Sequence, residues 1–79
     1  MHFYKLENKE IDRMFLEGSP VSCKAVVPEK DYITGKLEEG TLLVIILSNG
    51  KKYKGQIAEF ICRVHDGVAE GELKVLRAT

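Results

Sequence analysis

The fold is decided by residues 41–64, which read TLLVIILSNGKKYKGQIAEFICRV. The stretch Thr41–Leu47 is a continuous apolar run rich in β-branched residues, a pattern typical of a strand covered on both faces. We expect it to be the central strand of a sheet or an interface strand. The dipeptide Asn49-Gly50 that follows favours a type I′ turn, which needs positive φ at both central residues. The sequence therefore predicts that Thr41–Leu47 pairs antiparallel with the segment after Gly50.

The apolar residues of that next segment change parity along its length. The two groups are first Tyr53 and Ile57, then Phe60, Cys62 and Val64. Because side chains on a strand alternate between its faces, a change of parity near Ala58 and Glu59 predicts a β-bulge, or a strand that bends from one side of a barrel to the other.

The N-terminal part of the chain predicts a short strand followed by a helix. Residues 2–6 form the strand, from which Phe3 and Leu6 are expected to enter the core. Asn8 is a suitable N-cap for a helix over Lys9–Glu17, and Gly18 stands where a glycine commonly ends a helix. The apolar face of this helix consists of Ile11, Met14 and Phe15. So short a helix is stable only when that face packs on other elements.

The rest of the chain predicts further strands. Val21–Val27 alternates between apolar and polar residues, and Pro28 ends the strand or marks an edge. The polar stretch 29–40 is expected to be a long loop with one turn of helix. Asp66-Gly67 offers a second turn, and Leu73 and Val75 alternate with polar neighbours in a closing strand.

These elements predict one mainly β (α+β) domain over residues 1–79. Its order of about five short strands with one short N-terminal helix is satisfied best by a small, partly open β-barrel, with the helix plugging one side.

Composition sets the broad class. The chain has 79 residues, of which 44% are hydrophobic and 30% charged, as in an ordinary globular domain. Basic and acidic residues number 12 each, so a nucleic-acid site would have to be a local patch. Without an export signal or a membrane-length apolar run, we expect a cytoplasmic protein with no membrane partner. In that compartment Cys23 and Cys62 are expected to be buried free thiols rather than a disulfide.

Catalytic patterns are sparse, so we expect a non-enzymatic protein without a metal or cofactor. No nucleophile elbow, phosphate-binding glycine loop or HExxH motif occurs. A metal site or a cysteine nucleophile could be assembled from Cys23, Cys62, His2, His65 and Asp66, but the spacing favours structural roles. The acids Glu29, Asp31, Glu38 and Glu39 could act as general acids or metal ligands, although a solvated loop accounts for them.

The one basic cluster consists of Lys51, Lys52 and Lys54, with Tyr53 between them. An aromatic residue interleaved with lysines is how many small barrels hold single-stranded nucleic acid. The competing interpretation is a solvated hairpin whose edge lysines discourage aggregation.

The order of these elements resembles the ASCH group of PUA-like barrels over most of the chain. The similarity lies in a helix ending at Gly18, a strand at Val21–Ala25, and the stretches LEEGTLLV (37–44) and GQIAEF (55–60). It implies a binding module for RNA or a modified nucleoside in a barrel cleft. Of that group's charged residues after the glycine only Lys24 is kept, and Thr41 replaces an aspartate, so the resemblance extends to the fold more than to the ligand cluster.

Two other likenesses are open. Residues 47–60 are similar to the first motif of Sm-like RNA-binding proteins, and residues 27–57 resemble the β-barrel domain of membrane-fusion adaptor proteins. Our first functional hypothesis is a module that binds RNA or a nucleotide-like ligand through Lys24 and the lysine hairpin. The alternative is a protein-assembly or homo-oligomerisation domain, and an enzyme using Lys24 with the acidic loop is third.

Overall fold

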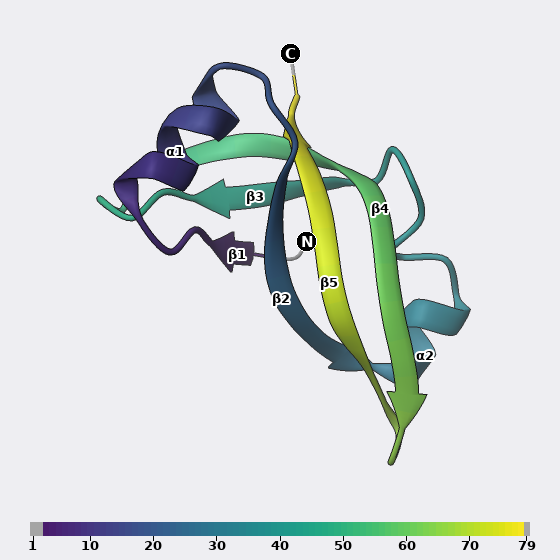
Figure 1. The fold of residues 1–79 in the computed structure, drawn as a ribbon. Coiled ribbons are helices and arrows are strands. Elements are labelled where there is room, and N and C mark those ends of the chain that lie inside the picture. Colours follow the sequence, from purple (N-terminus) through teal and green to yellow (C-terminus); the bar gives the residue numbers. More distant parts are fainter. Residues whose placement is uncertain (1–2, 79) are drawn as a thin grey trace.

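A computed structural model describes residues 3–78 as one five-stranded sheet with two helices. The elements are β1 (Phe3–Lys5), α1 (Lys9–Leu16), β2 (Val21–Pro28), α2 (Glu29–Ile33), β3 (Leu42–Ile46), β4 (Lys52–His65) and β5 (Val68–Arg77). The strand order is β1-β3-β4-β5-β2, and only β1 and β3 run parallel. The sheet curls into a nearly closed barrel, which confirms the predicted fold class (Figure 1).

The central strand β4 bends where the parity of its apolar residues predicted a bulge. Ile57 pairs with Val75 and Glu59 with Lys74, so Ala58 is an extra residue in the ladder. The first half of β4 follows β3, and its second half turns to follow β5 (Figure 1). The bulge lets both halves of one strand face the same interior, which confirms the interpretation of the parity change.

Both predicted hairpins form, but the type I′ geometry belongs to the second one. At the first turn Gly50 has φ +90°, whereas Asn49 is not among the residues with positive φ. The Gly50 N–H donates to the carbonyl of Leu47, and the Leu47 N–H donates to that of Lys51. This is a three-residue loop that ends in a left-handed glycine, so the predicted type I′ turn at Asn49-Gly50 is wrong.

At the second hairpin both central residues have positive φ. Asp66 lies at +49° and Gly67 at +77°, and His65 pairs directly with Val68 across them. A two-residue loop with this backbone is a type I′ turn, whose twist matches that of the long β4–β5 ladder.

Strand β3 is buried on one face only, which corrects the prediction for Thr41–Leu47. Leu43, Ile45 and Leu47 are buried, but Leu42 is 48% exposed and the alternate residues between them are half-buried. The continuous apolar run reflected one core face and one solvent-facing apolar strip. β3 has a neighbour on each side, while the central place in the sheet belongs to β4.

The orientation of strand β1 contradicts the prediction for Phe3. Leu6 is buried and Tyr4 is half-buried, so alternation turns Phe3 outward, where it is 57% exposed. The expectation that Phe3 enters the core is therefore wrong. His2, the first residue of the predicted strand, lies outside the described residues.

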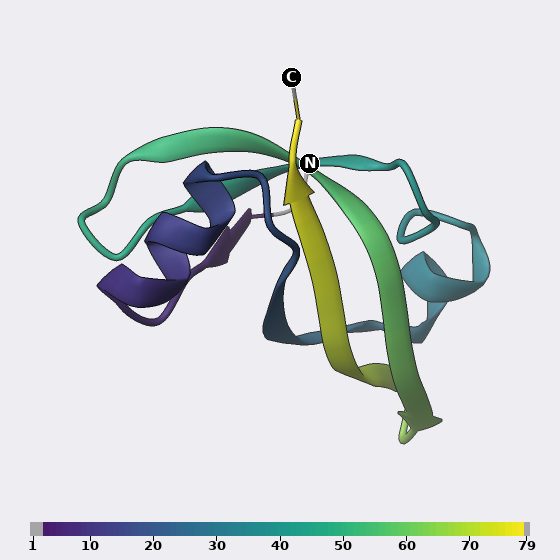
Figure 2. The ribbon, with the colours of Figure 1, turned by 45° about the horizontal axis from the view of Figure 1, so that its top comes forward.

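The two helices lie at opposite ends of the barrel (Figure 2). Asn8 caps α1 by accepting a hydrogen bond from the Ile11 N–H through Oδ1, at 3.0 Å. At its other end the N–H groups of Gly18 and Ser19 donate to helix carbonyls in a Schellman arrangement. Phe15 from this helix is fully buried. The predicted cap, helix and terminating glycine are confirmed.

Both cysteines are free thiols. Cys23 is buried on β2, and burial, followed by the nearby charge of Glu7, raises its pKa to about 11. Cys62 is only half-buried, and a side-chain hydrogen bond with it raises the pKa of the Tyr32 hydroxyl. The prediction of free thiols is confirmed, although full burial holds only for Cys23.

Candidate functional site

The outer surface of β1, β3 and β4 carries lysines on both sides of an apolar strip. Register places Lys5, Ile46 and Lys52 side by side in one row across the three strands. The next row is Phe3, Val44 and Lys54. In the third, Leu42 pairs with Gln56. We call this surface the basic face; its residues are Phe3, Lys5, Leu42, Val44, Ile46, Lys52, Lys54 and Gln56.

The charge of the basic face is entirely positive. It contains three lysines and no acidic residue, although the whole chain has no net charge. All three lysines are exposed, and within residues 3–78 none of them forms an ion pair. The described part of the chain therefore places no acidic group against these ammonium groups, and their charges add to a local positive potential.

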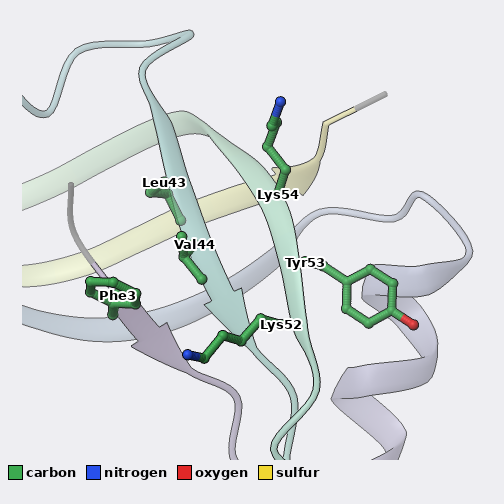
Figure 3. Close-up of a pocket in the computed structure, with 6 residues that line it drawn as sticks. All are labelled: Phe3, Leu43, Val44, Lys52, Tyr53 and Lys54. Atoms are coloured by element: carbon green, nitrogen blue, oxygen red, sulfur yellow. The ribbon is translucent and has the colours of Figure 1, made fainter.

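A shallow hollow of about 210 Å³ lies on this face between β1 and β4. Figure 3 shows Phe3, Val44 and Lys52 along it. The Lys52 side chain extends toward Phe3, whereas the Lys54 side chain points away from Phe3. The hollow thus combines an exposed aromatic residue, an aliphatic floor and the cationic side chain of Lys52. Such a surface suits a ligand that is flat and apolar in one part and anionic in another.

Tyr53 borders the hollow, but its side chain is not part of the basic face. Its side chain leaves β4 on the opposite side from Lys52 and Lys54, toward α1 (Figure 3). There its ring meets that of Phe15 edge-on, with centroids 6.4 Å apart, and the Arg77 guanidinium lies 5.2 Å from its centroid. The structure therefore gives this aromatic residue a packing role against the helix.

The remaining predicted ligand residues lie elsewhere. Lys24 is exposed on β2, where its register partner is Glu72 of β5, and it is not a strand neighbour of the basic face. Lys51 is exposed at the β3–β4 turn, and its N–H donates to Oδ1 of Asn49. The structure therefore brings together Lys52 and Lys54 from the predicted group, and adds Phe3 and Lys5.

The predicted acidic and metal-ligand candidates do not converge. Asp31 of the acidic loop lies 3.5 Å from the ammonium group of Lys36. The ring of His65 lies between two carboxylates, with Nε2 2.9 Å from Glu70 and Nδ1 3.5 Å from Asp66. Among residues 3–78 no three acidic, histidine or cysteine side chains are placed to hold a metal ion. Neither helix in that range has the length and hydropathy to span a bilayer.

Phe3 and Lys5 were not among the ligand residues predicted from the sequence. The signal was present, because Tyr4 and Leu6 form the apolar alternation that packs inward and Phe3 and Lys5 take the other parity. Five residues were too few to choose between the two parities without the pairing to β3.

Comparisons with protein-family models, with curated proteins and with solved structures found no match for this chain. By its sheet and its surface, the chain is a small barrel-like β domain with a basic outer face. The resemblance to ASCH and PUA-like domains stays a prediction.

Proposed function

We propose that this protein is a non-enzymatic RNA-binding module and that the basic face is its binding surface. The observation that supports this most directly is a set of three lysines around an apolar strip, which has no acid among its residues and forms no ion pair within residues 3–78. Phosphates of a nucleic acid would neutralise the lysines, and release of counterions would then drive association.

The zero net charge of the chain favours binding through a small local site over long-range attraction of nucleic acid. The chain has 12 basic and 12 acidic residues, so its long-range field is weak. Attraction would come from the three lysines alone, and the logarithm of affinity should fall with the logarithm of salt concentration with a slope of about −2, at roughly −0.7 per phosphate contact on a single strand.

The test is a titration of a fluorescently labelled single-stranded RNA at about 50 mM and about 200 mM salt. The unchanged protein should bind more weakly at the higher salt. The double variant Lys52→Glu, Lys54→Glu should bind at least tenfold more weakly at the lower salt and lose most of the salt dependence. Unchanged binding by this variant would reject the basic face as the site.

Two single charge reversals, each of which changes the net charge half as much as the double variant, separate the site from general charge effects. Lys9→Glu changes an exposed lysine on α1 and should leave binding within about twofold, after allowance for net charge. Lys24→Glu tests the lysine that the sequence grouped with the hairpin. A loss of binding with Lys24→Glu equal to that of the double variant would place the contact surface on another part of the barrel.

Protein assembly is the second candidate, and exposed apolar side chains on the same face favour it. Phe3 is 57% exposed and Leu42 48% exposed. A second copy of the chain could cover them, although the lysines of both copies would then approach one another. Sedimentation of the protein over a wide concentration range tests this: a dimer that Leu42→Lys dissociates would support assembly, and a monomer at all concentrations would reject it.

A further inference from the structure

We infer that the ligand is an unpaired strand whose phosphates follow β4 and of which one base stacks on Phe3. This inference rests on the proposed function and adds the ligand class and its path. Phe3 is the one aromatic residue of the basic face, and the residue is 57% exposed. An exposed ring beside cationic side chains is the arrangement on which proteins stack nucleic-acid bases.

Strand geometry sets the path of the backbone. Lys52 and Lys54 are two residues apart on β4, so their Cα atoms lie about 6.7 Å apart along the strand. Phe3 lies across β3 from Lys54, two strand spacings or about 10 Å away. The Lys52 side chain extends toward Phe3 (Figure 3), so a phosphate bound at Lys52 would have its base over the aliphatic surface of Val44, next to the Phe3 ring.

The side chains between Phe3 and the lysines of β4 are apolar. They can contact the face of a base but cannot form hydrogen bonds with its edge. Val44 and Ile46 are aliphatic and half-buried, and Leu42 is exposed beside them. Contacts of this kind act on the face of a base, which every base possesses, so binding should tolerate changes of sequence. In a duplex that face is covered by stacking neighbours, so a duplex can use the lysines but not Phe3.

The experiment measures how Phe3→Leu changes binding of ligands whose bases are exposed, absent or paired. Binding of a short single-stranded RNA is compared with binding of the same backbone carrying abasic nucleotides, and of the matching duplex. Phe3→Leu should weaken binding of the intact single strand about tenfold. It should leave the salt slope unchanged and affect the abasic strand and the duplex less than twofold. Phe3→Tyr, which keeps the ring, should retain binding.

The outcomes separate this inference from the proposed function. If Phe3→Leu binds all three ligands like the unchanged protein while Lys52→Glu, Lys54→Glu fails to bind, the stacking inference is overturned and the basic face stands. If the duplex binds as tightly as the single strand, the unpaired ligand class is overturned. If the unchanged protein binds none of the ligands, the proposed function itself fails. Circular dichroism of each variant, which should match that of the unchanged protein, confirms that the change acts on binding.

Discussion

Asp12 is the buried polar residue that ties the helix to the first hairpin. Its carboxylate accepts hydrogen bonds from the Ser48 N–H, at 3.1 Å to each oxygen, and from the Ser48 hydroxyl. Asp12 is 7% exposed. Hydrogen bonds to an ionised group in a dry site are stronger than neutral ones. The helix is thereby held over the β3–β4 turn, at a point 36 residues further along the chain.

We expect Asp12→Ala to lower the free energy of unfolding by about 2 kcal/mol, because it removes the hydrogen bonds that the N–H and hydroxyl of half-buried Ser48 donate to the carboxylate. Urea unfolding followed by circular dichroism measures this. Glu10→Ala, which removes an exposed carboxylate from the same helix, serves as the control and should cost under about 0.5 kcal/mol. Equal losses in the two variants would contradict a special role for Asp12.

Because of Cys23, the stability of the fold should decrease as the pH rises in the alkaline range. Its pKa is raised from 9.0 to about 11 in the folded chain, so between these values the unfolded chain has lost the thiol proton and the folded chain retains it. Stability is therefore complete below pH 9 and falls as pH rises toward 11, by on the order of 2 kcal/mol. Tyr4 acts in the same direction, since burial, with smaller effects of Cys23 and Asp31, raises its pKa.

The measurement is the urea midpoint at a series of pH values from 8 to 11. The unchanged protein should lose stability steadily above pH 9, and Cys23→Ala should show a shallower decline from a lower starting value. A decline of the same slope in both proteins would show that Cys23 does not carry the effect.

At the scale of elements, the bulge in β4 decides which side chains form the core. Before Ala58 the inward residue is Ile57, and after it the inward residues are Phe60 and Cys62. A deletion of Ala58 would make Ile57, Glu59 and Phe60 consecutive, so β4 would pair with Val75, Lys74 and Leu73 of β5 without an extra residue and Phe60 would still face inward. The deletion would remove the bulge at which β4 bends from β3 to β5.

We therefore expect the Ala58 deletion to lower the melting temperature, because β4 then lacks the bulge that lets it follow both β3 and β5. The substitution Ala58→Ser keeps the extra residue and should cost about 1 kcal/mol or less. Circular dichroism melting and the dispersion of amide NMR signals distinguish these outcomes. A deletion variant with native dispersion and an unchanged melting temperature would show that the bend of β4 does not depend on the extra residue.

At the scale of the whole molecule, β4 joins the two parts of the barrel into one unit. Its first half pairs with β3 and its second half with β5, and Ile57 lies at the bend with 1% exposure. The backbone of Ile57 also bonds to the segment before β3, through Gly40 and Thr41. A strand shared in this way leaves neither part with a complete core of its own.

Unfolding should accordingly be a single transition. Ile57→Val removes one buried methyl group and should lower stability by about 1 kcal/mol. Far-ultraviolet circular dichroism and tyrosine fluorescence should report the same shifted midpoint. Midpoints that separate in the variant would show that the two parts unfold independently.

Local patterns in the sequence determined much of the architecture. Asn8, the helical apolar spacing and Gly18 specify α1 through contacts only a few residues apart. The alternation in residues 21–27 and the parity change at Ala58 determined two strands and the bulge, because the period of a strand is visible in its own residues. The class of fold followed from the order of these elements.

The tertiary structure alone decided which face each ambiguous strand presents. Phe3 and Leu42 look like core residues in the sequence, yet both face outward in the sheet. Phe3 lies in one row with Val44 and Lys54, and Leu42 pairs with Gln56. Tyr53, which the sequence places among those lysines, packs instead against Phe15. A run that is apolar at every position contains no information about its orientation, so only the neighbours that pair with it and the interior they enclose could set which side chains are buried.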